Sequence, residues 1–449
     1  MKPRSILWLQ LTTCLSLLIS TEAVRELVFV QAIWRHGDRA PLSLPYPKDP
    51  YTESAWQRGW QQLTNLGMNQ LNELGRYFRA TYSDFIASHY IPSQVYIRSS
   101  DSDRALTSAQ AFLSGFYPAE GSFQWQPGNT WQPIPIHAST PGEPDLLLKP
   151  TSTNCKEYDA LVEADDAEQA EVYNKKYADL FKLLGNQTGI ANFSYVNINR
   201  IYNVERELIH NMTEKQPEWV FKKWSEYDGK GTMEIIGELR RIRMMTKFNS
   251  PEKAMTNKGF RDVRVINGYD KEEEEPKKNS RTLRLAKGVG HNLLVVDDGD
   301  SVYMGSYLLN NLIENALKVA NGSMKNPDKM LLYSSHDGTV LGLMYAMNVA
   351  NDLMIPYAAA LIMEIYKDGD EYFAELLYRN DTSKPAYKVP IPWCGDPCTV
   401  KKLGDYPTTL LSSYAEQQNL CGTPLPECKG TPTTASYVLS AVMVIMVFL

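Results

Sequence analysis

The sequence predicts an α/β protein in which helices cover a sheet and a second, helical part is inserted into the chain. In three places a short apolar run rich in β-branched and aromatic residues is followed by a polar turn and an amphipathic stretch. Residues from about Cys155 to Phe248 instead contain few glycines or prolines and show helical periodicity. A chain of 449 residues has room for two or three domains, or for one large domain with such an insertion.

The first two strand-turn-helix units lie near the N-terminus. The apolar run Glu26–Trp34 predicts a buried strand ending at Arg35, and Leu63–Ile86 has apolar residues at helical spacing. The second unit combines a strand over Val95–Arg98 with a helix from about Ala105 to Phe116.

Less regular chain and the insertion follow. Tyr117–Pro150, rich in Pro, Gly and Trp, predicts irregular structure, and Ala167–Leu184 and Met233–Lys247 predict helices. The charge run Lys271–Lys278 is typical of a solvated loop, with a partner-binding tail as the weaker alternative. The last third predicts a helix over Ser301–Val319 and a strand with a polar turn over Lys329–Thr339. A second helix over Val340–Met347 and a β-hairpin over Ala359–Tyr378 follow. The predicted α/β domain therefore comprises residues 24–150 and 261–428, the cap insertion comprises 151–260, and residues 1–23 and 429–449 lie outside both.

Both ends of the chain indicate the secretory pathway. Lys2 and Arg4, an apolar stretch up to Ile19 and the small-x-small pattern at Thr21–Ala23 are typical of a signal peptide over residues 1–23. The apolar tail Tyr437–Leu449 would span about 20 Å as a helix, against a bilayer core of about 30 Å. Behind a polar spacer, this tail predicts a GPI-anchor signal or a short membrane anchor, and a soluble product is the third alternative. We therefore expect an extracellular or surface-anchored protein.

Sequons and cysteines agree with this route. Five N-x-S/T sequons predict glycosylation at Asn186, Asn192, Asn211, Asn321 and Asn380. Removal of the signal peptide leaves five cysteines, an odd number. In an oxidising compartment Cys394 and Cys398 can close a small disulfide loop, which is favoured over a zinc site because no histidine lies nearby at ligand spacing.

Polar clusters follow all three predicted strands, at Arg35–Arg39, Arg98–Arg104 and Ser334–Asp337. If the strands are neighbours in one sheet, these clusters meet at one edge and place several guanidinium groups, two imidazoles and an aspartate together. The net charge of −6 argues against a nucleic-acid partner, so this cationic patch must be local. Such a group of residues suits an anion with several oxygens.

The residue types in this patch predict phosphate chemistry. Arginine pairs bidentately with phosphate and stays charged at any relevant pH. Among such cations the pKa of a histidine falls, so His36 stays neutral in acid and can attack phosphorus. A nearby carboxyl such as that of Asp337 can protonate the departing alkoxide if it is itself protonated, which favours low pH. The arginines would stabilise the transferring phosphoryl group without a metal.

Other chemistries lack their motifs. No P-loop, H-E-x-x-H or G-x-S-x-G pattern occurs, and we predict neither a metal nor a cofactor. Asp297–Ser301 hints at a calcium loop, but Leu308 stands where a bidentate glutamate is required. The remaining histidines are interpreted as structural: His89, His137, His210 and His291.

The motif RHGDRAP at Arg35–Pro41 resembles the R-H-G-x-R-x-P signature of the histidine acid phosphatases of the prostatic and lysosomal type. The similarity continues over Leu63–Arg79, Val95–Pro118, Leu331–Met347 and Pro356–Thr382, and reaches Trp393–Cys398. It is weakest in the helical insertion.

The resemblance implies a phosphoglycerate-mutase-like, doubly wound α/β sheet with a smaller helical cap. It implies a phosphohistidine on His36 and Asp337 as proton donor. Arg35, Arg39, Arg104 and His336 would bind phosphate, whereas Arg98 receives no catalytic role. The resemblance also implies a homodimer and a longer disulfide from Cys155 to Cys421 or Cys428. The chain lacks the cytosolic sorting tail of lysosomal members, which disfavours a lysosomal location.

The leading hypothesis is a metal-independent acid phosphatase of broad specificity for small phosphate monoesters. A specialised phosphatase for inositol polyphosphates or lysophosphatidic acid is the nearest alternative, and a mutase is disfavoured by the signal peptide. A surface binding protein that has lost catalysis is the alternative from another class.

Overall fold

The computed structural model describes residues 25–153, 155–249 and 305–406, together with Ser413, Ala415 and Cys421. The predicted signal peptide, the charge run Lys271–Lys278, the rejected calcium loop and the apolar tail all lie outside these residues. Within the described ranges, no helix combines the length and apolar character that crossing a bilayer requires.

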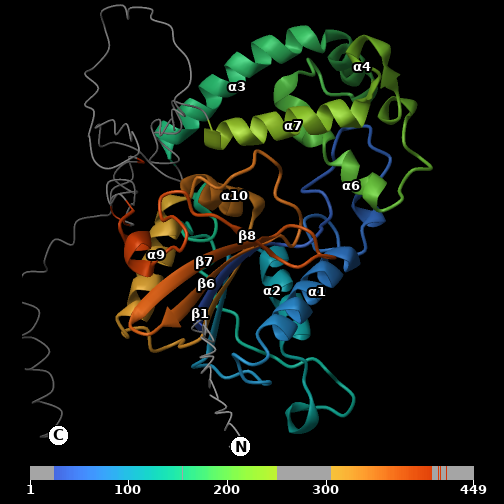
Figure 1. The fold of residues 1–449 in the computed structure, drawn as a ribbon. Helices are drawn as coiled ribbons and strands as arrows, with labels where there is room; N and C mark the ends of the chain where they lie inside the picture. Colours follow the sequence, from blue (N-terminus) through green and yellow to red (C-terminus); the bar gives the residue numbers. More distant parts are fainter. Residues whose placement is uncertain are drawn as a thin grey trace, which may run out of the picture.

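One mixed sheet of six strands forms the centre of the α/β domain, in the order β2-β5-β1-β6-β7-β8. Its strands are β1 (Glu26–Arg35), β2 (Val95–Ser99), β5 (Met330–Ser335), β6 (Ala360–Asp368), β7 (Glu371–Arg379) and β8 (Tyr387–Val389). Figure 1 labels β1, β6, β7 and β8 of this sheet. Strands β2, β5 and β1 are parallel, while β6, β7 and β8 run antiparallel to their neighbours. The carboxyl ends of the three parallel strands therefore meet at one edge, where ligands bind in sheets of this kind.

Helices cover both faces of the sheet, which explains why β1 is apolar almost throughout. Val30 and Trp34 of β1 pack with helices α1 (Asn65–Thr81) and α2 (Asp103–Phe116). Phe29 and Ile33 point to the other face and pack with α9 (Ser306–Ala320) and α10 (Asp337–Ala346). This alternation gives a three-layer α/β domain, as predicted.

A helical cap stands over the carboxyl edge of the parallel strands (Figure 1). Its helices are α3 (Lys156–Lys176), α4 (Ala178–Thr188), α5 (Ile198–Ile201), α6 (Val204–Ile209) and α7 (Thr232–Asn249), with a small ribbon of β3 (Lys223–Trp224) and β4 (Lys230–Gly231). The cap has its own core, in which Leu184, Trp224 and Leu239 are buried. Tyr46 belongs to the same core although it precedes the insertion, so the loop after β1 joins the two parts. Helix α7 also packs on α10.

Local differences from the predicted elements follow from tertiary packing. The helix predicted over Ala167–Leu184 is two helices, because Tyr177 leaves helical geometry and is buried in the cap core. Helix α10 begins at Asp337, three residues earlier than predicted, with His336 as its N-cap residue. Strands β3, β4 and β8 were not predicted, because runs of two or three residues carry no periodic signal.

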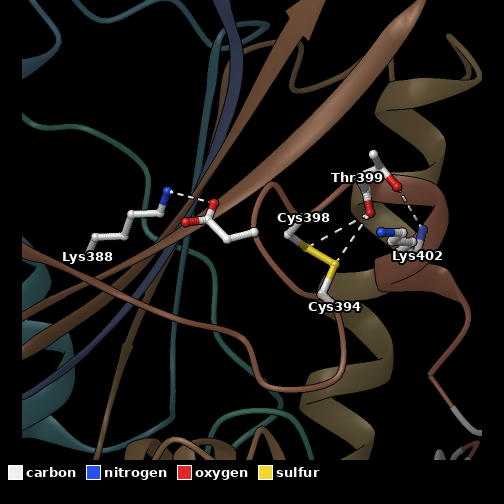
Figure 2. Close-up of a disulfide and its surroundings, with 6 residues drawn as sticks. Lys388, Cys394, Cys398, Thr399 and Lys402 are labelled. Carbon is white, nitrogen blue, oxygen red and sulfur yellow. Dashed lines mark hydrogen bonds and ion pairs between the residues drawn. A yellow bond between two sulfur atoms is a disulfide. The ribbon is translucent and has the colours of Figure 1, made fainter. Parts of the chain in front are cut away.

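Two disulfides occur in the described chain. Cys394 is bonded to Cys398, and this loop leads into α11 (Val400–Gly404) (Figure 2). The backbone N–H of Lys402 donates to the Thr399 side chain, which caps α11. Cys155, at the start of α3, is bonded to Cys421, whereas the alternative partner Cys428 lies outside the described residues.

Candidate active site

The ends of the three parallel strands bring the predicted residues to one place. Arg35 is the last residue of β1 and pairs in register with Ser335, the last residue of β5. The backbone N–H of His36 donates to the Ser335 carbonyl over 2.9 Å, so His36 and His336 leave the sheet side by side. Arg104 arrives from the first turn of α2, directly after β2.

His36 presents one unprotonated ring nitrogen to this cluster. Its Nδ1 lies 2.8 Å from the Gly37 carbonyl oxygen, which can only accept, so Nδ1 carries the proton and Nε2 the lone pair. The Nε of Arg104 donates to that Nε2 over 3.3 Å. Burial, followed by the charge of Arg35, holds the pKa of His36 well below its ordinary value. The imidazole is therefore neutral in acid.

His336 is held beside it. Its Nε2 lies 2.8 Å from Ser100 Oγ, and its Nδ1 lies 3.4 Å from a terminal nitrogen of Arg104. Burial, followed by the Arg104 charge, lowers the pKa of His336 to about 3. Arg104 thus contacts both imidazoles, whose ring centroids are 5.5 Å apart.

Arg35 and Asp337 form an ion pair at the other side of His36. Their closest nitrogen and oxygen are 3.1 Å apart, and Arg35 also donates to the Ile355 carbonyl. Burial alone would raise the pKa of Asp337, but Arg35 and Arg240 outweigh it and hold that pKa well below its ordinary value. In the free site Asp337 is therefore ionised.

Arg39 completes the cationic set. It donates to the Ala40 carbonyl over 2.8 Å, and its buried Nε has no hydrogen-bond partner among the described residues. Burial, followed by repulsion from Arg206 and Arg104, lowers the pKa of Arg39 to about 10, so the side chain remains charged in acid.

Close backbone packing fixes the loop that carries His36. A Cβ atom on Gly37 would lie 2.3 Å from the Gly67 carbonyl oxygen, and one on Gly67 would lie 2.0 Å from that of Asp38. Only glycine permits this approach of the loop to the start of α1. The Gly37 N–H also donates to Ser108 of α2 over 3.1 Å.

The role of Asp38 was not predicted. This carboxylate is buried and accepts a hydrogen bond from Thr64 Oγ1 over 2.6 Å. Its oxygens also lie 2.6 Å from His210 Nε2 and 3.6 Å from a terminal nitrogen of Arg206. His210, interpreted as an isolated structural histidine, thus joins the cap to the loop of His36. His210 lies 172 residues from Asp38 in the sequence, so no local pattern reveals this contact.

A cleft of about 850 Å³ opens between the sheet edge and the cap. The sheet domain contributes Arg35, Arg39, Asp337 and Tyr357, and the cap contributes Asn199, Tyr202, Arg206 and Arg240. Lys384 and Asp381, paired over 2.9 Å, stand at its rim.

Other candidates lie elsewhere. Arg98 pairs with Asp145 over 3.0 Å and takes no part in the cluster. His89 stacks on Phe123 and His137 on Tyr96, and His291 lies outside the described residues. Within those residues, no three His, Cys, Asp or Glu side chains are grouped so that they could hold a metal ion.

The site combines a neutral, buried histidine with fixed cations, at the carboxyl edge of an α/β sheet and under a helical cap. This combination is typical of enzymes that transfer phosphate through a histidine. The chain belongs to the histidine phosphatase superfamily (branch 2), whose family model matches residues 26–379.

Curated relatives agree with this assignment. Prostatic acid phosphatase of Homo sapiens is 32% identical over 386 residues, covering 85% of this chain and 84% of its own. Lysosomal acid phosphatase of Xenopus laevis is 30% identical over 398 residues, covering 88% and 79%. Among solved structures, the phytase from Citrobacter braakii has a TM-score of 0.55 at 14% identity, covering 88% of this chain and 99% of its own, which shows a shared fold. The protein is a phosphate-monoester hydrolase of the acid phosphatase kind.

Proposed function

We propose that hydrolysis proceeds through a phosphohistidine on Nε2 of His36, with Asp337 as the proton donor. The observation that carries the proposal is the hydrogen bond from His36 Nδ1 to the Gly37 carbonyl, which leaves Nε2 unprotonated, as the nucleophile beside Arg104. In this proposal the cations Arg35, Arg39 and Arg104, with His336, bind the phosphoryl group next to it.

The first step forms one bond and breaks one. The lone pair of His36 Nε2 attacks phosphorus, the bond from phosphorus to the ester oxygen breaks, and Asp337 transfers its proton to that oxygen. In the second step water attacks the phosphohistidine, and the Asp337 carboxylate accepts the proton that the water loses. Inorganic phosphate is then formed and His36 is neutral again; Asp337 carries the proton while phosphate is bound and is ionised once the site is free. The arginines stabilise the phosphoryl oxygens in both steps.

Trapping the intermediate tests this proposal. Enzyme and a phosphorus-labelled aryl phosphate are mixed at acid pH and denatured in alkali, because the phosphoramidate bond survives base but not acid. We expect label on the peptide that contains His36, and none in His36→Ala, which should be inactive. Activity in His36→Ala, label at another residue, or loss of activity to a chelator would contradict the proposal.

Substrates with a second anionic group are a second candidate class, favoured by the cap side of the cleft. Arg240 lines the cleft and forms no ion pair with a described carboxylate, and Arg206 has a buried Nε with no hydrogen-bond partner among the described residues. These cations supplement the predicted set. They are the feature expected for an inositol polyphosphate substrate, whereas lysophosphatidic acid requires an apolar wall.

Arg240→Gln separates these classes. If Arg240 binds a second anionic group, kcat/KM should fall about 10-fold or more for an inositol polyphosphate. It should change little for p-nitrophenyl phosphate, whose leaving group needs no proton and whose hydrolysis therefore depends little on the pKa of Asp337 that Arg240 lowers. An equal effect on both substrates would leave broad specificity as the better description. Lysophosphatidic acid belongs in the same substrate panel.

We also propose that the protein passes through the secretory pathway. The two disulfides and the exposed sequon residues Asn186, Asn192, Asn211 and Asn321 support this route. Asn380 is only partly exposed and lines the cleft. Sensitivity of the purified protein to an N-glycosidase tests the proposal. The membrane anchor and the homodimer remain predictions.

A further inference from the structure

Tyr357 lies among the cations of the site but has no part in the mechanism above. The Cζ atoms of Arg35 and Arg206 lie 3.9 Å and 4.6 Å from the centroid of its ring. The ring of His36 is 5.8 Å away, centroid to centroid. Groups from the sheet domain and from the cap therefore hold this ring beside the nucleophile.

The hydroxyl of Tyr357 lacks the hydrogen-bond partner that a buried hydroxyl normally has. It is buried and has no hydrogen-bond partner among the described residues, although the residue lines the cleft. Most buried polar groups are hydrogen-bonded, because desolvation of an unpaired hydroxyl is unfavourable. The missing partner is therefore expected to be a ligand.

The charges around Tyr357 indicate what that ligand is. Its ring lies against the guanidinium groups of Arg35 and Arg206, and Arg39 lines the same cleft. All three guanidinium groups only donate hydrogen bonds, so none can accept from the hydroxyl. A ligand that accepts from the tyrosine and is attracted by three cations is an anion with several oxygens.

We propose that the Tyr357 hydroxyl donates a hydrogen bond to a non-bridging oxygen of the bound phosphoryl group. Tyr357 is then a further substrate-binding residue, and its stack with Arg206 joins phosphate binding to the cap. The inference rests on the proposed function, since it needs the phosphoryl group to occupy the space beside His36.

Tyr357→Phe tests the hydroxyl and keeps the ring. We expect kcat/KM for an aryl phosphate to fall about 10- to 100-fold, and the inhibition constant of inorganic phosphate to rise about 10-fold or more, the range for loss of one donor to a charged oxygen. The thermal shift produced by saturating phosphate should shrink. An unchanged phosphate inhibition constant overturns the proposal even if kcat falls, because a merely structural role would not weaken phosphate binding selectively.

Tyr117→Phe is the matched control. Its hydroxyl is also buried without a partner among the described residues, but the residue lies in the apolar core at the C-terminal end of α2. We expect wild-type kinetics and phosphate inhibition for this variant. If Tyr357→Phe fails to fold, site-specific 3,5-difluorotyrosine keeps the ring and makes the hydroxyl a stronger donor. This substitution should tighten phosphate binding at pH 5. Phosphate binding equal to that of the wild type at this pH overturns the proposal.

The phosphohistidine proposal is tested separately by His36→Ala. If that variant stays active while Tyr357→Phe weakens phosphate binding, the assignment of His36 as nucleophile is wrong and the hydrogen bond from Tyr357 to phosphate stands. If His36→Ala is inactive and Tyr357→Phe binds phosphate normally, the hydrogen bond from Tyr357 is wrong and the assignment of His36 stands.

Discussion

A pair of buried carboxyl groups makes the attachment of the cap depend on pH. Glu207 of α6 and Asp49 of the loop after β1 are both buried. Gln216 donates to Glu207 Oε2 over 2.6 Å, and the Tyr51 N–H donates to Asp49 Oδ1 over 2.9 Å. The remaining oxygens, Asp49 Oδ2 and Glu207 Oε1, receive no N–H or hydroxyl donor from the described residues. A proton shared between the two carboxyls would pair these oxygens, and the raised pKa values of both groups agree with such a proton.

The pKa values of the pair set the size of the effect. Burial, followed by the charge of Asp49, raises the pKa of Glu207 to about 8, and burial raises that of Asp49 to about 6. A change from 4.5 to about 8 corresponds to about 5 kcal/mol. We count the shared proton once and expect on the order of 3 kcal/mol. The folded state binds this proton more tightly than the unfolded chain. Its stabilisation is therefore complete below about pH 4.5 and is lost as pH rises through about 8.

Glu207→Gln tests this reasoning directly. The amide is neutral at every pH and can donate to Asp49, so this contribution to the pH dependence should disappear. Urea unfolding of both proteins between pH 4.5 and 8.5 should show the wild-type free energy of unfolding falling by about 3 kcal/mol more than that of the variant. Glu218→Gln, at an exposed site in the same cap, should retain the wild-type slope. Equal slopes for wild type and Glu207→Gln would refute the shared proton.

Three further substitutions have defined outcomes. Asp337→Asn should lower kcat about 100-fold or more for alkyl phosphates and much less for a p-nitrophenyl ester, whose leaving group needs no proton; equal losses would argue against a proton donor. Cys155→Ser should lower the free energy of unfolding, measured without reductant, by about 2–5 kcal/mol, because it removes a disulfide between residues that are 266 positions apart in the sequence. Gly67→Ala should displace Asp38 and reduce activity about 10-fold or more. Gly237→Ala, at a position where a Cβ atom meets open space, should leave activity unchanged. Full activity of Gly67→Ala would contradict the close approach of Gly67 to the Asp38 backbone.

The sheet and the cluster of cations and histidines at its edge could be predicted because their signals are local. An apolar run such as Glu26–Trp34 predicts a strand buried on both faces, and a polar cluster directly after each parallel strand lies at the carboxyl edge. Predicting that His36 and His336 lie close together needed only that rule and the assumption that their strands are neighbours. The structure confirms the assumption, since β1 and β5 pair from Val30 to Arg35.

The cap side of the site could not be predicted in the same way. Arg206 and Arg240 lie on α6 and α7, and His210 directly follows α6; the sequence marks all three only as polar positions. The folding of the insertion over the sheet decides that the two arginines line the cleft and that His210 meets Asp38. Tyr357 had a usable signal. It lies three residues before the start of β6. Strand β6 runs antiparallel to β1, so the start of β6 adjoins the end of β1. The Ala358 N–H indeed donates to the His36 carbonyl over 3.4 Å.

The ionised state of Asp337 in the free site has to be reconciled with a proton donor. Its low pKa depends on Arg35, 3.1 Å away, and on Arg240, which together outweigh burial. A bound phosphate ester brings negative charge to the same guanidinium groups and cancels much of their effect on the carboxyl. Burial, which favours the neutral acid, then dominates, and the pKa of Asp337 rises when substrate binds. On this account the arginines keep Asp337 charged in the free enzyme, and the substrate itself turns it into an acid at the moment a leaving group needs a proton.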